Sequence, residues 1–465
     1  MRTTLLFLFI TIVLSKPLKY SIALHYPSDE ESFNSDIFSV PKVFMKNKVL
    51  ISSFNPLTNL FSINMTTLDP NTKSLKSNEN LYKEVLLREK SEDINRPEYL
   101  VDIALNENYI LAGVPNGENL TLYYMKTNFM HDPNIKFIRY SIGKIFPIEE
   151  KGVINSVKIL PFFYSSKFLI ITSWRKICSD EYDHYKFISV DIRNNILNVV
   201  KERDFLFNTW TYSYDEYALK TVITKTNKIV SVKNGIRGSL IILTLNEDLL
   251  TLYRNDDWIG HMHYFHKFEL THVIGDLVLL CYNYKYEPDM TCLFLQIDIN
   301  GGIDAETIRT GLNTDLNKLK CRETREYYLK TLNKNNVVLI SRENIQEEFT
   351  FKVYENYNNI LVEIPDNDNK LKIKEGGYLN INMDVFDNDV YILYEDSKEM
   401  SLYVVNLKKV IDDYYENSIN LVIIIIGVCS VLSLAFVLRV YKKRKIKNEE
   451  NAEKENNKGE ELVEL

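Results

Sequence analysis

The chain has 465 residues, of which 45% are hydrophobic and 12% aromatic, and its formal net charge is −7 at pH 7. This length and apolar content are enough to bury large cores, and the mild negative charge gives no electrostatic support for a nucleic-acid partner. Five cysteines in a chain of this size exclude a small domain held together mainly by disulfides.

The first 15 residues have the pattern of a secretory signal peptide. Arg2 supplies a positive charge, the apolar segment Leu5–Leu14 is too short to span a membrane, and cleavage is expected after Ser15. An uncleaved N-terminal anchor is the alternative. The signal-peptide pattern predicts that the chain from residue 16 onwards enters the secretory pathway.

Residues 16–417 are strand-like almost throughout, and one unit recurs along them. A polar or Gly/Asn turn precedes a continuous β-branched strand, and a second turn leads to a strand in which apolar and polar residues alternate. Most units follow the previous one after roughly 50–60 residues, with one shorter step between Gly238 and Gly275. The seven predicted hairpins begin near Asn47, Asn108, Lys167, Gly238, Gly275, Asn335 and Asn388.

This period predicts an all-β fold, namely a β-propeller-like repeat domain with seven blades over residues 16–417. We expect the continuous strand to be the buried inner strand of a blade and the alternating strand to be its half-exposed outer strand. A single blade cannot bury its own faces, so neighbouring blades would stack around an axis. A pair of β-sandwiches is the alternative, because no diagnostic blade motif accompanies the repeat.

Four cysteines lie in this predicted domain: Cys178, Cys281, Cys292 and Cys321. Cys281 and Cys292 flank a segment whose turn is expected near Pro288, so the two cysteines would face each other across a hairpin. We therefore predict a Cys281–Cys292 disulfide, which leaves Cys178 to pair with Cys321 if their strands meet.

Three tyrosines between the paired cysteines, Tyr282, Tyr284 and Tyr286, share one face of the predicted hairpin. Such a stripe is a candidate ligand-binding surface, because tyrosine offers a large contact area at low entropic cost. An aromatic ladder that packs on the neighbouring blade is the alternative.

Histidine is unevenly distributed, since four of the seven histidines lie within residues 260–272. The spacing of His261 and His263 places both imidazoles on one face of a strand, which suits a zinc or copper site or a pH sensor. A solvated connector between two hairpins is the alternative.

Two segments match the N-glycosylation sequon, one beginning at Asn64 and the other at Asn119. Passage through the secretory pathway would make both asparagines available to the glycosylation machinery. We therefore predict a glycoprotein modified at Asn64 and Asn119.

Residues 421–438 carry no charge and are followed by Arg439 and a basic run over residues 442–447. A helix of this length spans a hydrocarbon core about 30 Å thick, and flanking basic residues stay on the cytoplasmic side. We predict a transmembrane helix over residues 418–440, with the N-terminal domain lumenal or extracellular. Residues 441–465 are expected to form a disordered cytoplasmic tail.

These features together predict a single-pass type I membrane protein of the plasma membrane or of a secretory-pathway membrane. The sequence has no nucleophile elbow, zinc-protease motif, dinucleotide fingerprint or P-loop, so we predict no cofactor and assign no catalytic residue. The favoured function is a receptor or adhesin whose ectodomain binds a protein or glycan ligand. A membrane-anchored lumenal hydrolase and a resident secretory-pathway factor for folding or sorting are the alternatives.

Overall fold

The computed structural model consists of two compact units, residues 1–408 and residues 409–465. Strands make up the first unit and one long helix the second. The structure describes residues 20–24, 38–55, 58–69, 74–86, 101–116, 119–129, 136–143, 145, 152–176, 182–208, 219–234, 240–259, 265–284, 289–303, 318–320, 324–343, 348–357, 359–364, 369–372, 378–396 and 400–461.

The first unit is a β-propeller of seven antiparallel sheets, as the repeat predicted. Blade 1 contains β2 (Phe38–Met45), β3 (Lys48–Asn55), β4 (Leu60–Asp69) and β5 (Ser74–Val85). Blade 2 contains β6 (Asp102–Leu105), β7 (Tyr109–Asn116), β8 (Asn119–Lys126) and β9 (Ile138–Ile142), with the short helix η1 (Thr127–Phe129) after β8. Blade 3 contains β10 (Gly152–Pro161), β11 (Lys167–Lys176), β12 (Tyr182–Arg193) and β13 (Ile196–Asn208).

The remaining blades repeat this order from the axis outwards. Blade 4 contains β14 (Lys220–Ile223), β15 (Ile229–Asn234), β16 (Leu240–Leu245) and β17 (Thr251–Ile259). Blade 5 contains β18 (Phe265–Ile274), β19 (Leu277–Tyr284), β20 (Asp289–Gln296) and β21 (Lys318–Lys320). Blade 6 contains β22 (Thr324–Thr331), β23 (Asn336–Glu343), β24 (Glu348–Tyr357) and β25 (Ile360–Glu363), with β26 (Asn369–Lys372) also paired to β24.

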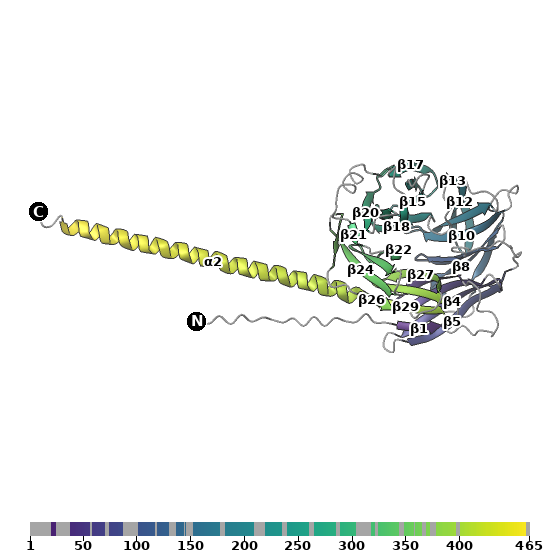
Figure 1. Ribbon diagram of the computed structural model, residues 1–465, viewed down its shortest axis with the longest axis horizontal. Helices are drawn as coiled ribbons and strands as arrows, with labels where there is room; N and C mark the ends of the chain where they lie inside the picture. The colour runs from purple at the N-terminus through teal and green to yellow at the C-terminus, as the bar shows by residue number, and fades with distance from the viewer. Residues whose placement is uncertain are drawn as a thin grey trace. The chain divides into compact units, whose positions relative to one another are not determined.

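Blade 7 closes the propeller with strands from both ends of the unit. It contains β27 (Tyr378–Phe386), β28 (Asp389–Asp396), β29 (Met400–Asn406) and, as its outermost strand, β1 (Tyr20–Leu24). Figure 1 shows the purple β1 beside the yellow-green β29, to which it pairs antiparallel. The innermost strands form a closed circle, because each contacts the next in the order β2, β6, β10, β14, β18, β22 and β27, and β27 contacts β2.

The hydrophobic core lies between neighbouring blades rather than at a single centre. Blades 1 and 2 share a cluster that contains Phe61 and Tyr123, whose stacked rings are 4.6 Å apart between centroids. Blades 3 and 4 share another cluster around Phe187 and Leu243. Each blade therefore buries its two faces only because its neighbours cover them.

The predicted hairpins correspond to one hairpin in each blade, but not always to the same strands. Six of them are formed by the second and third strands of a blade, whereas the hairpin near Gly238 is formed by β16 and β17, the third and fourth strands of blade 4. The second strand of blade 4 is β15, which begins earlier, at Ile229. This difference explains the shorter step in the sequence repeat.

The sequence interpretation placed the buried strand at the wrong position in the blade. β3 and β7 are buried along nearly their whole length, as their continuous apolar runs predicted. They are nevertheless the second strands of their blades, and β2 and β6 lie inside them. The innermost strands therefore escaped the sequence repeat, and their residues are described below as the candidate site.

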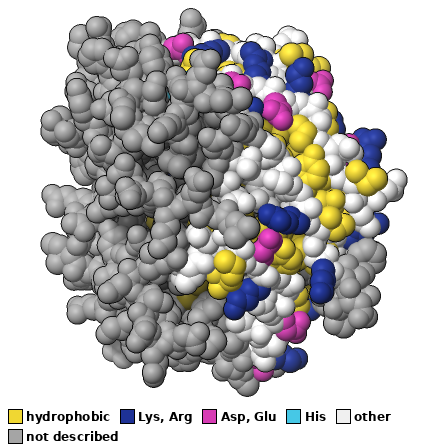
Figure 2. All heavy atoms as spheres, turned by 90° about the vertical axis from the view of Figure 1, so that its right-hand side faces the viewer, with side chains coloured by type: hydrophobic (Ala, Val, Ile, Leu, Met, Phe, Trp, Pro, Cys, Tyr) yellow, Lys and Arg dark blue, Asp and Glu magenta, His cyan; other side chains and the backbone are white. Residues whose placement is uncertain are grey.

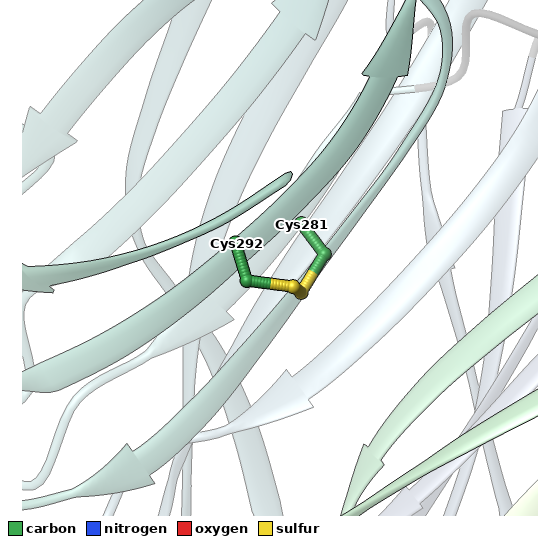
Figure 3. Close-up of a disulfide and its surroundings, with 2 residues drawn as sticks. All are labelled: Cys281 and Cys292. Atoms are coloured by element: carbon green, nitrogen blue, oxygen red, sulfur yellow. A yellow bond between two sulfur atoms is a disulfide. The ribbon is translucent and has the colours of Figure 1, made fainter. Parts of the chain in front are cut away.

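The predicted Cys281–Cys292 disulfide is confirmed and joins β19 to β20 (Figure 3). The two cysteines are directly opposite in the antiparallel register, with an S–S distance of 2.06 Å, and neither side chain is exposed to solvent. Cys178 and Cys321, which were expected to pair, lie outside the described residues.

The second unit is the helix α2, whose bounds are Lys408–Glu461. Its segment Lys408–Asn448 is long and apolar enough to cross a membrane, with a mean hydropathy of 3.1 in its most apolar window, and it contains the predicted span. The helix continues to Glu461 where we expected a disordered tail, because the tail is rich in glutamate and lysine, which are strong helix formers. The predicted signal peptide, residues 1–15, lies outside the described residues.

Removal of the disulfide should lower the thermal stability of the propeller. The bond closes a loop with a sequence separation of 11 residues, and a cross-link of this kind contributes on the order of 2–3 kcal/mol. We expect Cys281→Ala combined with Cys292→Ala to lower the melting temperature of the full chain in detergent, measured by circular dichroism. The control Cys429→Ala, at a free and exposed cysteine, should melt like the wild type; equal melting of the double variant would contradict the prediction.

Asp389, the first residue of β28, is a buried carboxyl group with an energetic cost at neutral pH. It is 7% exposed, and its Oδ1 has no hydrogen-bond partner among the residues that the structure describes. Burial raises the pKa of Asp389 from 3.8 to about 6, with Asp387 adding to the shift and Lys46 opposing it. The protonated Asp389 carboxyl therefore contributes to the stability of the folded propeller. This contribution is fully present below pH 3.8 and is lost as the pH rises through 6.

We expect Asp389→Asn to stabilise the propeller at pH 7.5 by on the order of 2 kcal/mol, because the variant removes a carboxylate that the fold desolvates. At pH 4 the wild-type carboxyl is largely protonated, so the variant and the wild type should melt alike. Thermal unfolding at both pH values checks this difference. A variant that is equally stabilised at pH 4 and pH 7.5 would show that ionisation is not the cause.

Candidate functional site

Each innermost strand carries one charged residue near the propeller axis. In blade 3 this residue is Lys158, and its neighbours Val157 and Ile159 are buried in the cluster between blades 2 and 3. Strand alternation directs the Lys158 side chain to the opposite face. We call the seven residues the axial ring: Lys42, Asp102, Lys158, Lys220, Glu269, Lys330 and Asp384.

The charges of the axial ring act on one another across the axis as well as between adjacent blades. Lys158 of blade 3 lowers the pKa of Lys330 of blade 6, on the far side of the ring. Glu269 of blade 5 raises the pKa of both lysines. The side chains therefore surround one shared space. Solvent reaches this space, because the Lys158 side chain is exposed.

Asp384 joins the last blade to the first. Its Oδ1 lies 3.0 Å from Lys42 Nζ, and its Oδ2 accepts a hydrogen bond of 2.8 Å from the Val43 backbone N–H. Burial by itself would lower the pKa of Lys42, but the charge and hydrogen bond of Asp384 outweigh it and raise that pKa. Val43 lies on an innermost strand, whose inner edge has no partner strand, so the carboxylate satisfies an edge N–H.

Asp102 makes the equivalent contact between blades 2 and 3. It accepts hydrogen bonds of 2.6 Å from the Ile159 N–H and 2.9 Å from the Ile103 N–H. Burial raises the pKa of Asp102 above its ordinary value, although Lys158 and the two N–H donors oppose the shift. The oxygens of Asp102 are therefore committed to the backbone of two blades.

The third carboxylate of the ring, Glu269, pairs with Lys220 of the preceding blade. Its Oε1 lies 2.9 Å from Lys220 Nζ, and the exposed fractions of the two side chains are 15% and 31%. All three carboxylates of the axial ring thus have a lysine or backbone partner.

Two lysines of the ring, Lys158 and Lys330, have no hydrogen bond or ion pair with any residue that the structure describes. Burial is the main cause of a pKa of about 8 for Lys330, with Lys158 adding to the decrease and Glu269 and Asp384 opposing it. Burial also lowers the pKa of Lys158. Each ammonium offers three hydrogen-bond donors, so an anion that binds between them would relieve their mutual repulsion.

The outer surface does not show a comparable concentration of charge on the face in Figure 2. There the Lys and Arg side chains, in dark blue, are interspersed with Asp and Glu and with hydrophobic side chains. Mixed charges of this kind keep a surface soluble and give little preference for an anion. The axial ring is therefore the candidate site.

The tyrosine stripe does not form an exposed surface at Tyr282. This side chain is 2% exposed and packs in the cluster between blades 4 and 5, so the binding role predicted for it was wrong and the packing alternative holds. The side chain of Tyr284 and all of Tyr286 lie outside the described residues, as do His261 and His263. The described part of the chain contains no group of three metal-ligating side chains.

The two sequons differ in their accessibility. Asn64 is 4% exposed in the middle of β4, which leaves no room for a glycan, so that part of the prediction does not fit the fold. Asn119 is the first residue of β8 and is partly exposed, and its glycosylation stays a prediction.

Reasoning from the sequence missed the axial ring, although the sequence contains its signal. Each innermost strand precedes the apolar strand of its blade and contains the charged residue that it contributes to the axial ring. These segments lack the continuous apolar run by which the repeat was recognised, so the repeat did not include them. The segments are VPKVF, VDIAL, SVKIL, LKTVI, KFELT, YLKTL and NMDVF.

No protein-family model matches the chain, and no curated protein matches it in sequence. Solved structures with a similar fold include an α-L-arabinanase of Penicillium chrysogenum in complex with arabinobiose, at 10% identity, covering 84% of this chain and 99% of that one, with a TM-score of 0.42. The polysaccharide lyase Uly1 is similar at 8% identity, covering 84% and 98%, with a TM-score of 0.47. Prolyl oligopeptidase B of Galerina marginata is similar at 9% identity, covering 80% and 52%, with a TM-score of 0.41. Similarity at this level carries no argument about function.

Loss of the Asp384 carboxylate should destabilise the closed ring. Asp384→Ala leaves the Lys42 ammonium and the Val43 N–H without their partner, which costs about 2–4 kcal/mol. We expect a lower midpoint in urea unfolding of the full chain, followed by tryptophan fluorescence. The control Asp204→Ala, at a 65% exposed side chain 4.0 Å from Lys186, should unfold like the wild type. Equal midpoints for the two variants would contradict a role in closure.

Proposed function

We propose that this protein is a single-pass type I membrane protein whose propeller binds an anionic ligand at the axial ring. The observation that carries the proposal is the pair Lys158 and Lys330, which form no hydrogen bond or ion pair with the described residues in a ring whose three carboxylates are all engaged. The ligand would present carboxylate, sulfate or phosphate groups, carried by a glycan or by an acidic protein segment. A protein with this role is a receptor or an adhesin.

The proposed placement rests on α2 and its flanks. The apolar segment of α2 is followed by Arg439 and by basic residues up to Lys447, which favour the cytoplasmic side of a membrane. The propeller would then face the lumen or the cell exterior, where acidic glycans and protein ectodomains occur. A plasma membrane or a secretory-pathway membrane fits this orientation.

Neutralising the two lysines should remove anion binding without loss of the fold. We expect Lys158→Gln combined with Lys330→Gln to weaken binding of oligogalacturonate or of a polyglutamate peptide by roughly 10- to 100-fold, measured by calorimetry on the full chain in nanodiscs. The matched control Lys201→Gln removes an exposed lysine from the outermost strand of blade 3 and should bind like the wild type. Binding that survives in the double variant would overturn the proposal.

The affinity for the anion should also depend on pH. Lys330, whose pKa is about 8, is protonated below that pH and loses its charge above it. Binding of the anion should therefore weaken as the pH rises from 7 to 9. In Lys330→Arg, which stays charged, the affinity should fall less over this range than in the wild type.

A second candidate is an enzyme that acts on the same anionic ligand, with Lys330 as a general base. The lowered pKa of Lys330 supports it, because a useful fraction of the amine is neutral near pH 7–8. A hydrolase with two catalytic carboxylates has less support, since it needs a free acid and a free carboxylate. Lys330→Arg separates the candidates: intact binding with lost release of shorter oligogalacturonates indicates an enzyme, and no release by the wild type indicates a binding protein.

A further inference from the structure

Away from the axis, blades 2 and 3 line a second site, an open pocket that we call the Tyr164 pocket. The pocket has a volume of about 700 Å³ and lies among the turns that follow β6, β8, β10 and β12. Its polar and aromatic lining includes Glu107, Asn108, Lys126, Asn128, Tyr164, Arg193 and Asn194. The axial ring contributes no residue to this lining, so the pocket is independent of the function proposed above.

Tyr164 has an unusual backbone conformation for its residue type. Its φ is +52°, in the left-handed region, where the other described non-glycine residues are asparagine or aspartate except for Leu249. Leu249 is fully buried, so core packing accounts for it. Tyr164 is 75% exposed, and packing in the fold gives no reason for a bulky side chain there.

The turn that carries Tyr164 is held on both sides. Asn227 of blade 4 accepts a hydrogen bond of 2.7 Å from the Phe163 N–H and donates one of 3.2 Å to the Phe163 carbonyl oxygen. Asn106 of blade 2 donates a hydrogen bond of 3.0 Å to the Ser165 carbonyl oxygen. The neighbouring blades therefore fix the backbone around an exposed aromatic ring, and a ligand would meet a preorganised surface.

The polar groups around the ring are available to a ligand. The side chains of Glu107, Asn108, Asn128 and Asn194 form no hydrogen bond or ion pair with the described residues. The Arg193 guanidinium is already paired with Asp191, at 2.8 Å. Lys126, which also lines the pocket, has an interaction of its own, so the groups left for a ligand are three neutral amides and one carboxylate, which suit hydroxyl groups.

From this arrangement we propose that the Tyr164 pocket binds a neutral carbohydrate. One sugar ring would stack its C–H face on Tyr164, while the amides and Glu107 exchange hydrogen bonds with its hydroxyl groups. The apolar residues of the pocket, Tyr109 and Ile192, are buried, so the pocket offers no apolar subsite for a peptide side chain. The ligand class therefore differs from the anion proposed for the axis.

An array of immobilised neutral oligosaccharides, built from hexoses and pentoses, tests the proposal with the full chain in nanodiscs. We expect the wild type to bind a subset of them, and titration with the free sugar to show at least tenfold weaker binding by Tyr164→Asn. Asparagine suits the left-handed backbone, so this variant should melt at the wild-type temperature or above it. Tyr164→Phe keeps the ring and should keep binding.

Two controls separate the pocket from other surfaces. Tyr357→Ala removes a tyrosine that is 64% exposed on blade 6 and should bind neutral sugars like the wild type. Lys158→Gln combined with Lys330→Gln should also leave neutral-sugar binding unchanged. The proposal is overturned if the wild type binds no neutral oligosaccharide, if Tyr164→Asn binds as well as the wild type, or if the lysine double variant abolishes the binding.

Discussion

The pairing of β1 with β29 joins the two ends of the propeller sequence in one sheet, and the contact of Asp384 with Lys42 and Val43 joins the same blades at the axis. A blade buries its faces only against neighbours, so an open array would leave two terminal faces in water. Closure of the ring buries both of these terminal faces. The cores between blades, and the position of every innermost strand, depend on these two contacts.

Closure also creates the axial space and decides its chemistry. Seven innermost strands meet around one axis, so one charged residue per strand is enough to bring both signs of charge together. The carboxylates serve the structure, because they pair with lysines or satisfy edge N–H groups of the next blade. Lys158 and Lys330 are not used in this way, and poor solvation lowers the pKa of both. The stability of the ring and the anion site proposed there thus have the same origin.

The two proposed sites use the propeller differently. The axis combines one side chain from each blade, and its selectivity comes from net positive charge in a poorly solvated space. The Tyr164 pocket belongs to only two blades, and its selectivity comes from an aromatic ring and neutral amides fixed by neighbouring turns. A ligand with neutral and acidic groups would present the chemistry that both sites accept.

The sequence by itself determined the repeat, the disulfide and the apolar helix. These depend on local patterns: β-branched runs such as that of β3, the spacing of Cys281 and Cys292, and the uncharged residues of α2. Only the tertiary structure decided the candidate site, because residues as far apart as Lys42 and Asp384 meet only after the ring closes. It also decided that Tyr282 is buried, since the exposure of a strand residue depends on which blade covers it.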